Sequence, residues 1–311
     1  MSSGIGSNMA YAGTKVLLNI IDYHTTTESR LKYLKQLLVA AGGDFSYVTE
    51  LNADSIHAKL KAHRKRVVDD GGFVPSMSNT LKAIIFALKN GLTSDIYSAY
   101  SPNFGFKKSG TSVIKIYDIN GRDYELLSGQ LEIAVDGKLN VIKNLSPSTM
   151  ISKVNSLAGG QGMILGACVH DADAGSSSSL SVRGMYMSDN PNASGTSLGH
   201  IETNAGGQTR LYYRRQADDV LTSLPYDQAT NYKKFAGLVG YMSNSNTRVE
   251  IYENGALKAG ATAGQKDISN ATIYPTMSML SLNSFFNESW IIKSNSQTLA
   301  IALSNYLNRS T

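Results

Sequence analysis

Two glutamates three residues apart, Glu250 and Glu253, are the carboxylates of this sequence that could form a catalytic pair. Glycosidases need two carboxyl groups in one cleft, about 5–5.5 Å apart in retaining enzymes and farther apart in inverting ones. Within "VEIYENG" the odd spacing directs the two side chains to opposite faces of a strand. We therefore expect no catalysis from this pair and interpret both glutamates as solvated or turn-supporting residues.

The run "HDADAG" places Asp171 and Asp173 where they could hold a calcium ion. An EF-hand loop needs Gly at its sixth position and Glu at its twelfth, and counting from Asp171 these positions hold Ser176 and Val182. A looser calcium site on the two aspartates stays open, and a polar loop at a strand end is the simpler interpretation. His170 has no second His or Cys at ligand spacing, so we expect no zinc site.

Nucleotide binding and nucleophilic catalysis also lack a motif. In "AGGQGMILG" the glycines do not follow the G-x-G-x-x-G spacing, and they precede a strand instead of opening a helix. Cys168 lies in an apolar strand, and no G-x-S-x-G sequence occurs. We interpret Cys168 as a small buried hydrophobe and expect a non-enzymatic protein without a cofactor.

Two tyrosines could contact a ligand at the surface. In "RLYYRR" Tyr212 and Tyr213 point to opposite faces of a strand, so one of them should be exposed beside Arg210 or Arg214. An exposed tyrosine beside arginine suits contact with a carbohydrate or a protein. The alternative is an ordinary half-buried strand with one tyrosine on its wet side.

The densest basic run, "KLKAHRKRVV", offers a surface for an acidic partner. On a helix, Lys61, Arg64 and Lys65 fall on one side, and Leu60, His63 and Val67 share the other. The three cations are candidate docking residues, and a solvated helix face is the alternative.

The composition of the chain limits which classes of protein it can belong to. The 311 residues are 42% hydrophobic and 17% charged, with 28 Gly and 17 Tyr, which suits strands and turns more than long helices. The single cysteine permits no intrachain disulfide. The first residues do not resemble a signal peptide, and no apolar run approaches the roughly 20 residues of a membrane span. We expect a soluble protein that is used where it is made or that leaves its cell by lysis.

The net charge of +5 is unevenly distributed, since the excess of Lys and Arg falls mainly before residue 90. We interpret this asymmetry as a sign of a domain boundary near residue 90 and not as a sign of nucleic-acid binding. The first part is predicted to be mixed α/β. The helix of "TTTESRLKYLKQLLVAAGG" begins with a Thr25–Glu28 capping box and stops at Gly42-Gly43. The other predicted elements are strands at 15–21 and 44–51, a helix from Asn52 or Asp54 to Val68, and a helix at 78–90.

After Gly91 short β-type runs follow one another, separated by Gly, Asn and Ser, which predicts an antiparallel sandwich or barrel. In "TRVEIYENGALKAG" the Asn254-Gly255 pair predicts a type I′ hairpin, with Val249, Ile251 and Leu257 on buried faces. The other predicted strands are 112–119, 130–135, 163–169, 181–187, 209–215, 235–242 and 274–282. Loops are expected at 171–179 and 188–197, and a helix at 295–310.

The final elements resemble the concanavalin A-like or laminin G-like jelly roll of bacterial and phage proteins. The likeness rests on the Asn-Gly hairpin, on the closing strand with Glu288, Trp290, Ile291 and Ile292, on the helix with Tyr306-Leu307, and on an opening segment (100–126) with Tyr117, Asp118, Asn120 and Gly121. It covers about 95–311 and implies an α+β chain: an N-terminal α/β attachment or oligomerisation region (1–92), then a β-sandwich (93–311) with a C-terminal helix. Trp290 is expected in its core.

The stretch "KAHRKRVVDDGGFVPSMSNTLKAIIFALKNGL" is similar to segments that precede jelly-roll domains in structural proteins of tailed bacteriophages. This resemblance implies a virion protein of the head, collar or tail, located on the particle surface. Its expected partners are other virion proteins, further copies of itself and a host-surface glycan, without nucleic acid or membrane insertion. The alternatives are a carbohydrate-binding adhesin module and, third, a glycoside hydrolase.

Overall fold

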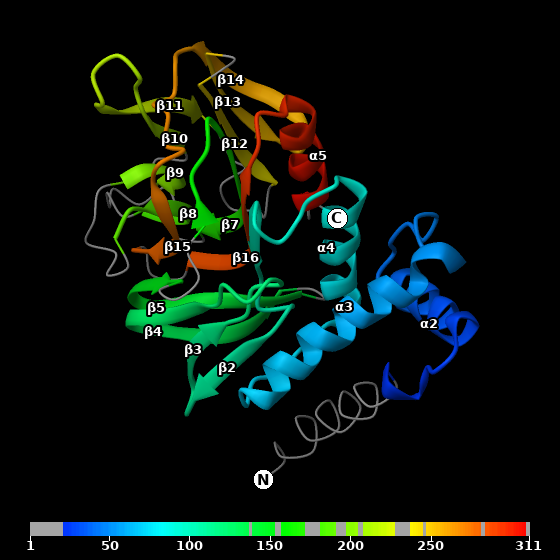
Figure 1. Cartoon of the computed structure of the whole chain (residues 1–311). Helices are drawn as coiled ribbons and strands as arrows, with labels where there is room; N and C mark the ends of the chain where they lie inside the picture. The colour runs from blue at the N-terminus through cyan, green and yellow to red at the C-terminus, as the bar shows by residue number, and fades with distance from the viewer. Residues whose placement is uncertain are drawn as a thin grey trace.

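The computed structural model describes residues 21–136, 139–152, 157–171, 181–190, 197–204, 208–227, 237–244, 247–280 and 284–308, without the side chains of 170, 171, 181–186, 203 and 204. Helices come first, antiparallel strands follow, and a further helix comes after the last strand, as predicted (Figure 1).

The helices are η1 (Ile21–Tyr23), α2 (Thr27–Ala40), α3 (Glu50–Asp69), α4 (Met77–Lys89) and α5 (Gln297–Leu307). The strands are β1 (Tyr97–Tyr100), β2 (Phe106–Ser109), β3 (Ser112–Ile116), β4 (Tyr124–Asp136), β5 (Leu139–Ile151), β6 (Leu157–Ala158), β7 (Gly162–Asp171), β8 (Ser181–Ser188), β9 (Ser197–Asn204), β10 (Gln208–Arg214), β11 (Leu221–Asp227), β12 (Leu238–Ser243), β13 (Arg248–Glu253), β14 (Ala256–Thr262), β15 (Thr272–Met279) and β16 (Ser284–Lys293).

Helix α2 begins one residue later than its predicted cap. The capping box is formed by Thr26 and Ser29, whose side chains accept from each other's backbone N–H groups at 3.2 Å. The prediction of Thr25 and Glu28 was therefore wrong. Ser29 can replace the usual Glu because its hydroxyl also reaches the backbone of the capping residue.

The segment 44–51 is a turn and not the predicted strand. The Asp44 carboxylate accepts from the backbone N–H of Ser46 at 2.8 Å, which closes a tight Asx turn. Asn52 Oδ1 then accepts from Thr49 N at 2.9 Å, so α3 begins after Thr49 and not at Asn52 or Asp54. The described part of the N-terminal region is helical, and predicted strand 15–21 lies outside the described residues apart from Ile21.

All strand pairings of the described sheet are antiparallel, in the order β11-β10-β9-β8-β15-β5-β16-β7-β12-β13-β14, with β4, β3 and β2 continuing from β5. The sheet folds back on itself, so that β9 lies across from β12 and β11 across from β13 and β14. A Cβ at Gly240 would meet Leu211 Cδ1 at 2.4 Å, so close approach of the two layers requires glycine there. The main apolar core lies between the layers.

A second core lies on the outer side of β16, β7, β12 and β13, where α4 and α5 cover the sheet (Figure 1). Trp290 is fully buried there between Phe86 of α4 and Tyr97 of β1, at ring-centroid distances of 5.2 and 5.5 Å. The predicted burial of Trp290 and of Cys168 is confirmed. Apolar cover on both sides explains why every residue of β12 is buried.

The predicted hairpin joins β13 to β14. Asn254 and Gly255 have φ angles of 50° and 81°, as a type I′ turn requires. Val249 and Ile251 are buried as predicted, but Leu257 is 56% exposed. A bulge between Ile251 and Tyr252 shifts the register and places Leu257 opposite Tyr252, on an edge strand with no neighbour beyond it among the described strands. The predicted burial of Leu257 was therefore wrong.

Charged and polar groups fasten α3 to the sandwich. Arg66 donates to both carboxylate oxygens of Asp123 at 2.8 and 2.7 Å. His63 lies within 2.8 Å of the Phe104 carbonyl oxygen, and burial lowers its pKa to about 4. Asp70, just after α3, accepts from the Tyr117 hydroxyl at 2.7 Å. Helix α4 contributes side chains to two cores, the one among the helices and the one between α4 and the sheet. This packing does not decide where one domain ends, so the proposed domain boundary at residue 92 stays a prediction.

Candidate functional site

The two tyrosines of β10 point to opposite faces, as predicted. Burial alternates along the strand, with Leu211 and Tyr213 inside the main core and Tyr212 on the outer side. Tyr213 is only 4% exposed, and burial raises the pKa of its hydroxyl. Tyr213 is therefore a core residue, and Tyr212 is the ligand-contact candidate of the pair.

Tyr212 stacks on His200 of β9. The two rings lie 4.3 Å apart at an interplanar angle of 16°, because the strand register pairs these residues directly. On the other side of Tyr212 the register pairs it with Ser223 of β11, which is exposed. A small residue at this position leaves room beside the tyrosine ring. We name the outer side of β9, β10 and β11 the Tyr212 face; its side chains are His200, Glu202, Gln208, Arg210, Tyr212, Arg214 and Ser223.

Two guanidinium groups flank the ring on the same strand. Arg210 lies within 3.4 Å of the Tyr212 hydroxyl and donates to Gln208 Oε1 at 2.9 Å. Arg214 donates to the Ser197 carbonyl at 2.8 Å and to the Asp219 carbonyl at 2.7 Å. These contacts hold both arginines beside the aromatic surface, where their remaining N–H groups can donate to hydroxyl or carboxylate oxygens of a ligand.

The sequence analysis missed His200 and Glu202, which complete the Tyr212 face. His200 Nδ1 lies 3.0 Å from Ser197 Oγ, and its Nε2 lies 3.4 Å from Glu202 Oε2. Both side chains are more than nine-tenths buried. Strand β9 was not predicted, although His200 and Glu202 alternate with the apolar Ile201 and so carried a period-two signal.

Glu250 and Glu253 are buried, at 5% and 2% exposure, so their interpretation as solvated residues was wrong. Glu250 accepts from the Tyr252 hydroxyl at 2.6 Å, and Glu253 accepts from the Tyr226 hydroxyl at 2.8 Å. Burial, and next the neighbouring glutamate, raises the pKa of both tyrosines. The hairpin is covered by α5 on one side and by β11 on the other, so the two carboxylates lie on opposite faces as expected.

The calcium candidates Asp171 and Asp173 lie outside the described side chains. Within the residues that the structure describes, no group of three or more His, Cys, Asp or Glu is placed to hold a metal ion. In the same part of the chain no helix is both long and apolar enough to cross a membrane.

The candidate docking residues on α3 are engaged within the chain. Lys61 and Arg64 both pair with Asp22, at 2.9 and 3.3 Å, and Lys65 pairs with Asp69. Lys61 and Lys65 are exposed, and Leu60, His63 and Val67 are buried, as the predicted division of the helix requires. The Arg64 side chain is only 14% exposed, so its predicted place on the solvated side was wrong. The positive charge of all three cations is partly neutralised by neighbouring carboxylates.

The sequence matches no protein-family model and no curated protein. Among solved structures, the binding domain of botulinum neurotoxin DC in complex with SialylT is similar at 11% identity and a TM-score of 0.47, over 69% of this chain and 52% of that one. A Trypanosoma rangeli sialidase is similar at 9% identity and a TM-score of 0.43, over 70% of this chain and 33% of that one. The CBM40 of a Ruminococcus gnavus sialidase, bound to sialyllactose, is similar at 14% identity and a TM-score of 0.35, over 47% of this chain and 84% of that one.

These likenesses are distant. The chain spans about half the length of the neurotoxin domains that it matches.

Proposed function

We propose that the chain is a non-enzymatic bacteriophage virion protein that displays a β-sandwich and contacts a host-surface glycan through the Tyr212 face. The observation that carries the glycan contact is the half-buried Tyr212 ring, with Ser223 beside it and Arg210 and Arg214 on either side. Sugars offer an apolar ring face and peripheral hydroxyls. An aromatic surface with fixed donors around it is complementary to both.

Attachment is assigned to the helical region. Helices α2 and α3 lie at one side of the molecule, well away from β10 and β11 (Figure 1). Five large apolar side chains are exposed in this region: Tyr23 at 77%, Val39 at 62%, Phe45 at 45%, Leu51 at 99% and Val68 at 43%. Exposed apolar residues favour a protein–protein interface, and virion proteins assemble as symmetric oligomers. This arrangement supports docking through the helices with the Tyr212 face directed outward.

The glycan contact is tested on an array of bacterial surface glycans with the full chain and three variants. We expect Tyr212→Ala to abolish binding and Tyr212→Phe to keep most of it, because the phenyl ring retains the stacking surface. Tyr23→Ala, which removes an equally aromatic but distant side chain, is the matched control and should bind as the unmodified chain does. No signal from the unmodified chain, or equal signals from the Tyr212→Ala variant, would contradict the contact.

The virion location is tested separately, by mass spectrometry and cryo-electron microscopy of the parent particle. We expect density for the helices against a neighbouring virion protein. Absence of the chain from the particle, together with glycan binding, would favour the second candidate, a carbohydrate-binding adhesin module. A glycoside hydrolase is less well supported, because the nearest candidate pair, Glu250 and Glu253, is split between two faces.

A further inference from the structure

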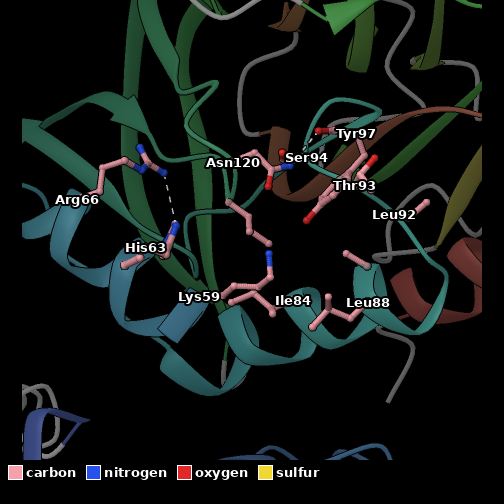
Figure 2. Close-up of a pocket in the computed structure, with 13 residues that line it drawn as sticks. Lys59, His63, Arg66, Ile84, Leu88, Leu92, Thr93, Ser94, Tyr97 and Asn120 are labelled. Carbon is pink, nitrogen blue, oxygen red and sulfur yellow. Dashed lines mark hydrogen bonds between the residues drawn. The ribbon is translucent and has the colours of Figure 1, made fainter. Parts of the chain in front are cut away.

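A pocket of about 510 Å³ opens where α3 and α4 meet the start of the sandwich (Figure 2). One wall is the stripe of α3 that carries Lys59, His63 and Arg66, and α4 supplies Ile84 and Leu88. The remaining wall comes from the segment between α4 and β1 and from the turn after β3. Its side chains there are Leu92, Thr93, Ser94, Tyr97, Ile119 and Asn120.

Lys59 is a positively charged residue of the pocket that has no acidic partner among the described residues. Its side chain extends from α3 into the pocket, toward the wall that holds Thr93 and Asn120 (Figure 2). It forms no ion pair with a described residue, whereas Lys61, two positions along, pairs with Asp22. Arg66, at the far end of the same stripe, is held by Asp123. An ammonium group above apolar side chains favours an anionic ligand group, and a carboxylate fits it.

The opposite wall offers hydrogen-bonding groups. Asn120 Nδ2 donates to the Tyr97 carbonyl at 3.0 Å, which leaves Asn120 Oδ1 able to accept from a ligand N–H. The hydroxyl of Thr93 donates to Asp95 and is the main reason why the pKa of that carboxyl is lowered, so the acid of this segment is engaged locally. The floor between the two walls is apolar, formed by Ile84, Leu88 and Ile119.

We propose that this pocket binds the carboxyl-terminal residue of a partner protein. Its carboxylate would pair with Lys59, its backbone N–H would donate to Asn120 Oδ1, and an apolar side chain would lie on Ile84 and Leu88. A carboxyl-terminal residue carries these three groups on one α-carbon, which suits a pocket of this size. The proposal is independent of the Tyr212 face and assigns a specific contact to the side of the molecule that holds the helices.

The only tryptophan provides a direct readout. Trp290 stacks on Tyr97, a residue of the pocket wall, and its indole N–H donates to Glu288 at 2.7 Å. Its single indole resonance in an NMR spectrum of the isotope-labelled full chain therefore reports on the pocket. We would titrate acetyl-glycyl-glycyl-leucine with a free carboxyl group and compare it with the same peptide as a carboxamide.

We expect a saturable shift with the acid and at least about tenfold weaker binding of the carboxamide, corresponding to one lost charged contact. Lys59→Met, which keeps the alkyl chain, should weaken binding of the acid about tenfold, and Lys61→Met should leave it unchanged. Equal binding of acid and carboxamide, no effect of Lys59→Met, or no saturable shift at millimolar peptide would overturn the proposal. A shift with N-acetylneuraminic acid but not with the peptide acid would also overturn it, by assigning the carboxylate to a sugar.

Discussion

The two outer faces of the sandwich differ in what lies on them. Outside β16, β7, β12 and β13 the side chains are apolar, and α4 and α5 cover them. Outside β9, β10 and β11 the side chains are His200, Glu202, Arg210, Tyr212 and Arg214, and β10 alternates between buried and half-buried residues. The continuously buried strands build the support, and the alternating strands keep a polar face for a ligand. The predictions below test this division, beginning with the largest effect.

Phe86→Ala should damage the covered face most. Phe86 lies edge-on to Trp290 and also contacts Tyr306, at ring-centroid distances of 5.2 and 4.6 Å. Removing the ring leaves a cavity beneath α4, so we expect the free energy of unfolding to fall by about 3–5 kcal/mol in urea denaturation. Phe45→Ala, on a half-exposed phenylalanine of the helical region, is the matched control and should cost far less. A loss below about 1 kcal/mol for Phe86→Ala would mean that α4 is dispensable for this core.

Substitutions of Tyr212 and Tyr213 allow the outer and inner sides of strand β10 to be compared. Tyr213→Ala should lower the free energy of unfolding by about 3 kcal/mol, because Tyr213 lies in the main core. Tyr212→Ala should cost about 1 kcal/mol or less while abolishing glycan binding. Thermal denaturation and the glycan array together separate the two roles. A larger loss of stability at Tyr212 than at Tyr213 would refute the assignment of the open face.

Substitution of Asp70 tests whether its contacts between the helices and the sandwich stabilise the fold at low pH. Partial burial would raise its pKa, but the Tyr117 hydroxyl and Lys115 outweigh burial and hold the pKa at about 2. Because this is below the value of the unfolded chain, about 3.9, Asp70 stabilises the fold above that pH and loses its contribution as the pH falls toward 2. Urea midpoints measured across this range should fall less steeply for Asp70→Asn than for the unmodified chain. Asp69→Asn, whose carboxyl pairs only with exposed Lys65 among the described residues, should leave the slope unchanged.

Leu257→Lys should have the smallest effect. Leu257 is 56% exposed on β14, an edge strand of the described sheet, and lysine is well tolerated on such edges. We expect the free energy of unfolding to stay within about 0.5 kcal/mol of its original value. A markedly lower urea midpoint would show that this leucine is covered in solution, for example by another copy of the chain.

Local signals predicted much of this architecture. The Asn254-Gly255 turn, the helices α3 and α4 and the burial of Trp290 all follow from residue type and spacing. The errors arose where a local pattern was compatible with more than one structure. Segment 44–51 has β-type residues, but the Asx turn at Asp44 and the cap at Thr49 decided its conformation.

The site was harder to predict than the fold. Tyr212 could be identified because its neighbour Tyr213 must face the other way on a strand. Its stacking partner His200 could not, since their contact depends on the register of β9 against β10. The burial of Glu250 and Glu253 likewise depends on α5 and β11, which are distant in sequence from the hairpin they cover. The pocket at Lys59 combines three separate segments and has no sequence motif of its own.

The position of β16 has a consequence for biosynthesis. This late strand pairs with β1, β5 and β7, and α5, which follows it, packs on β7, β12 and β13. While these residues are still in the ribosomal tunnel, β7 lacks a neighbour and the apolar side of α4 lacks its Trp290 contact. Folding of the sandwich must therefore wait until β16 and α5 have been synthesised, and a chain arrested before them would present an unpaired strand edge to chaperones.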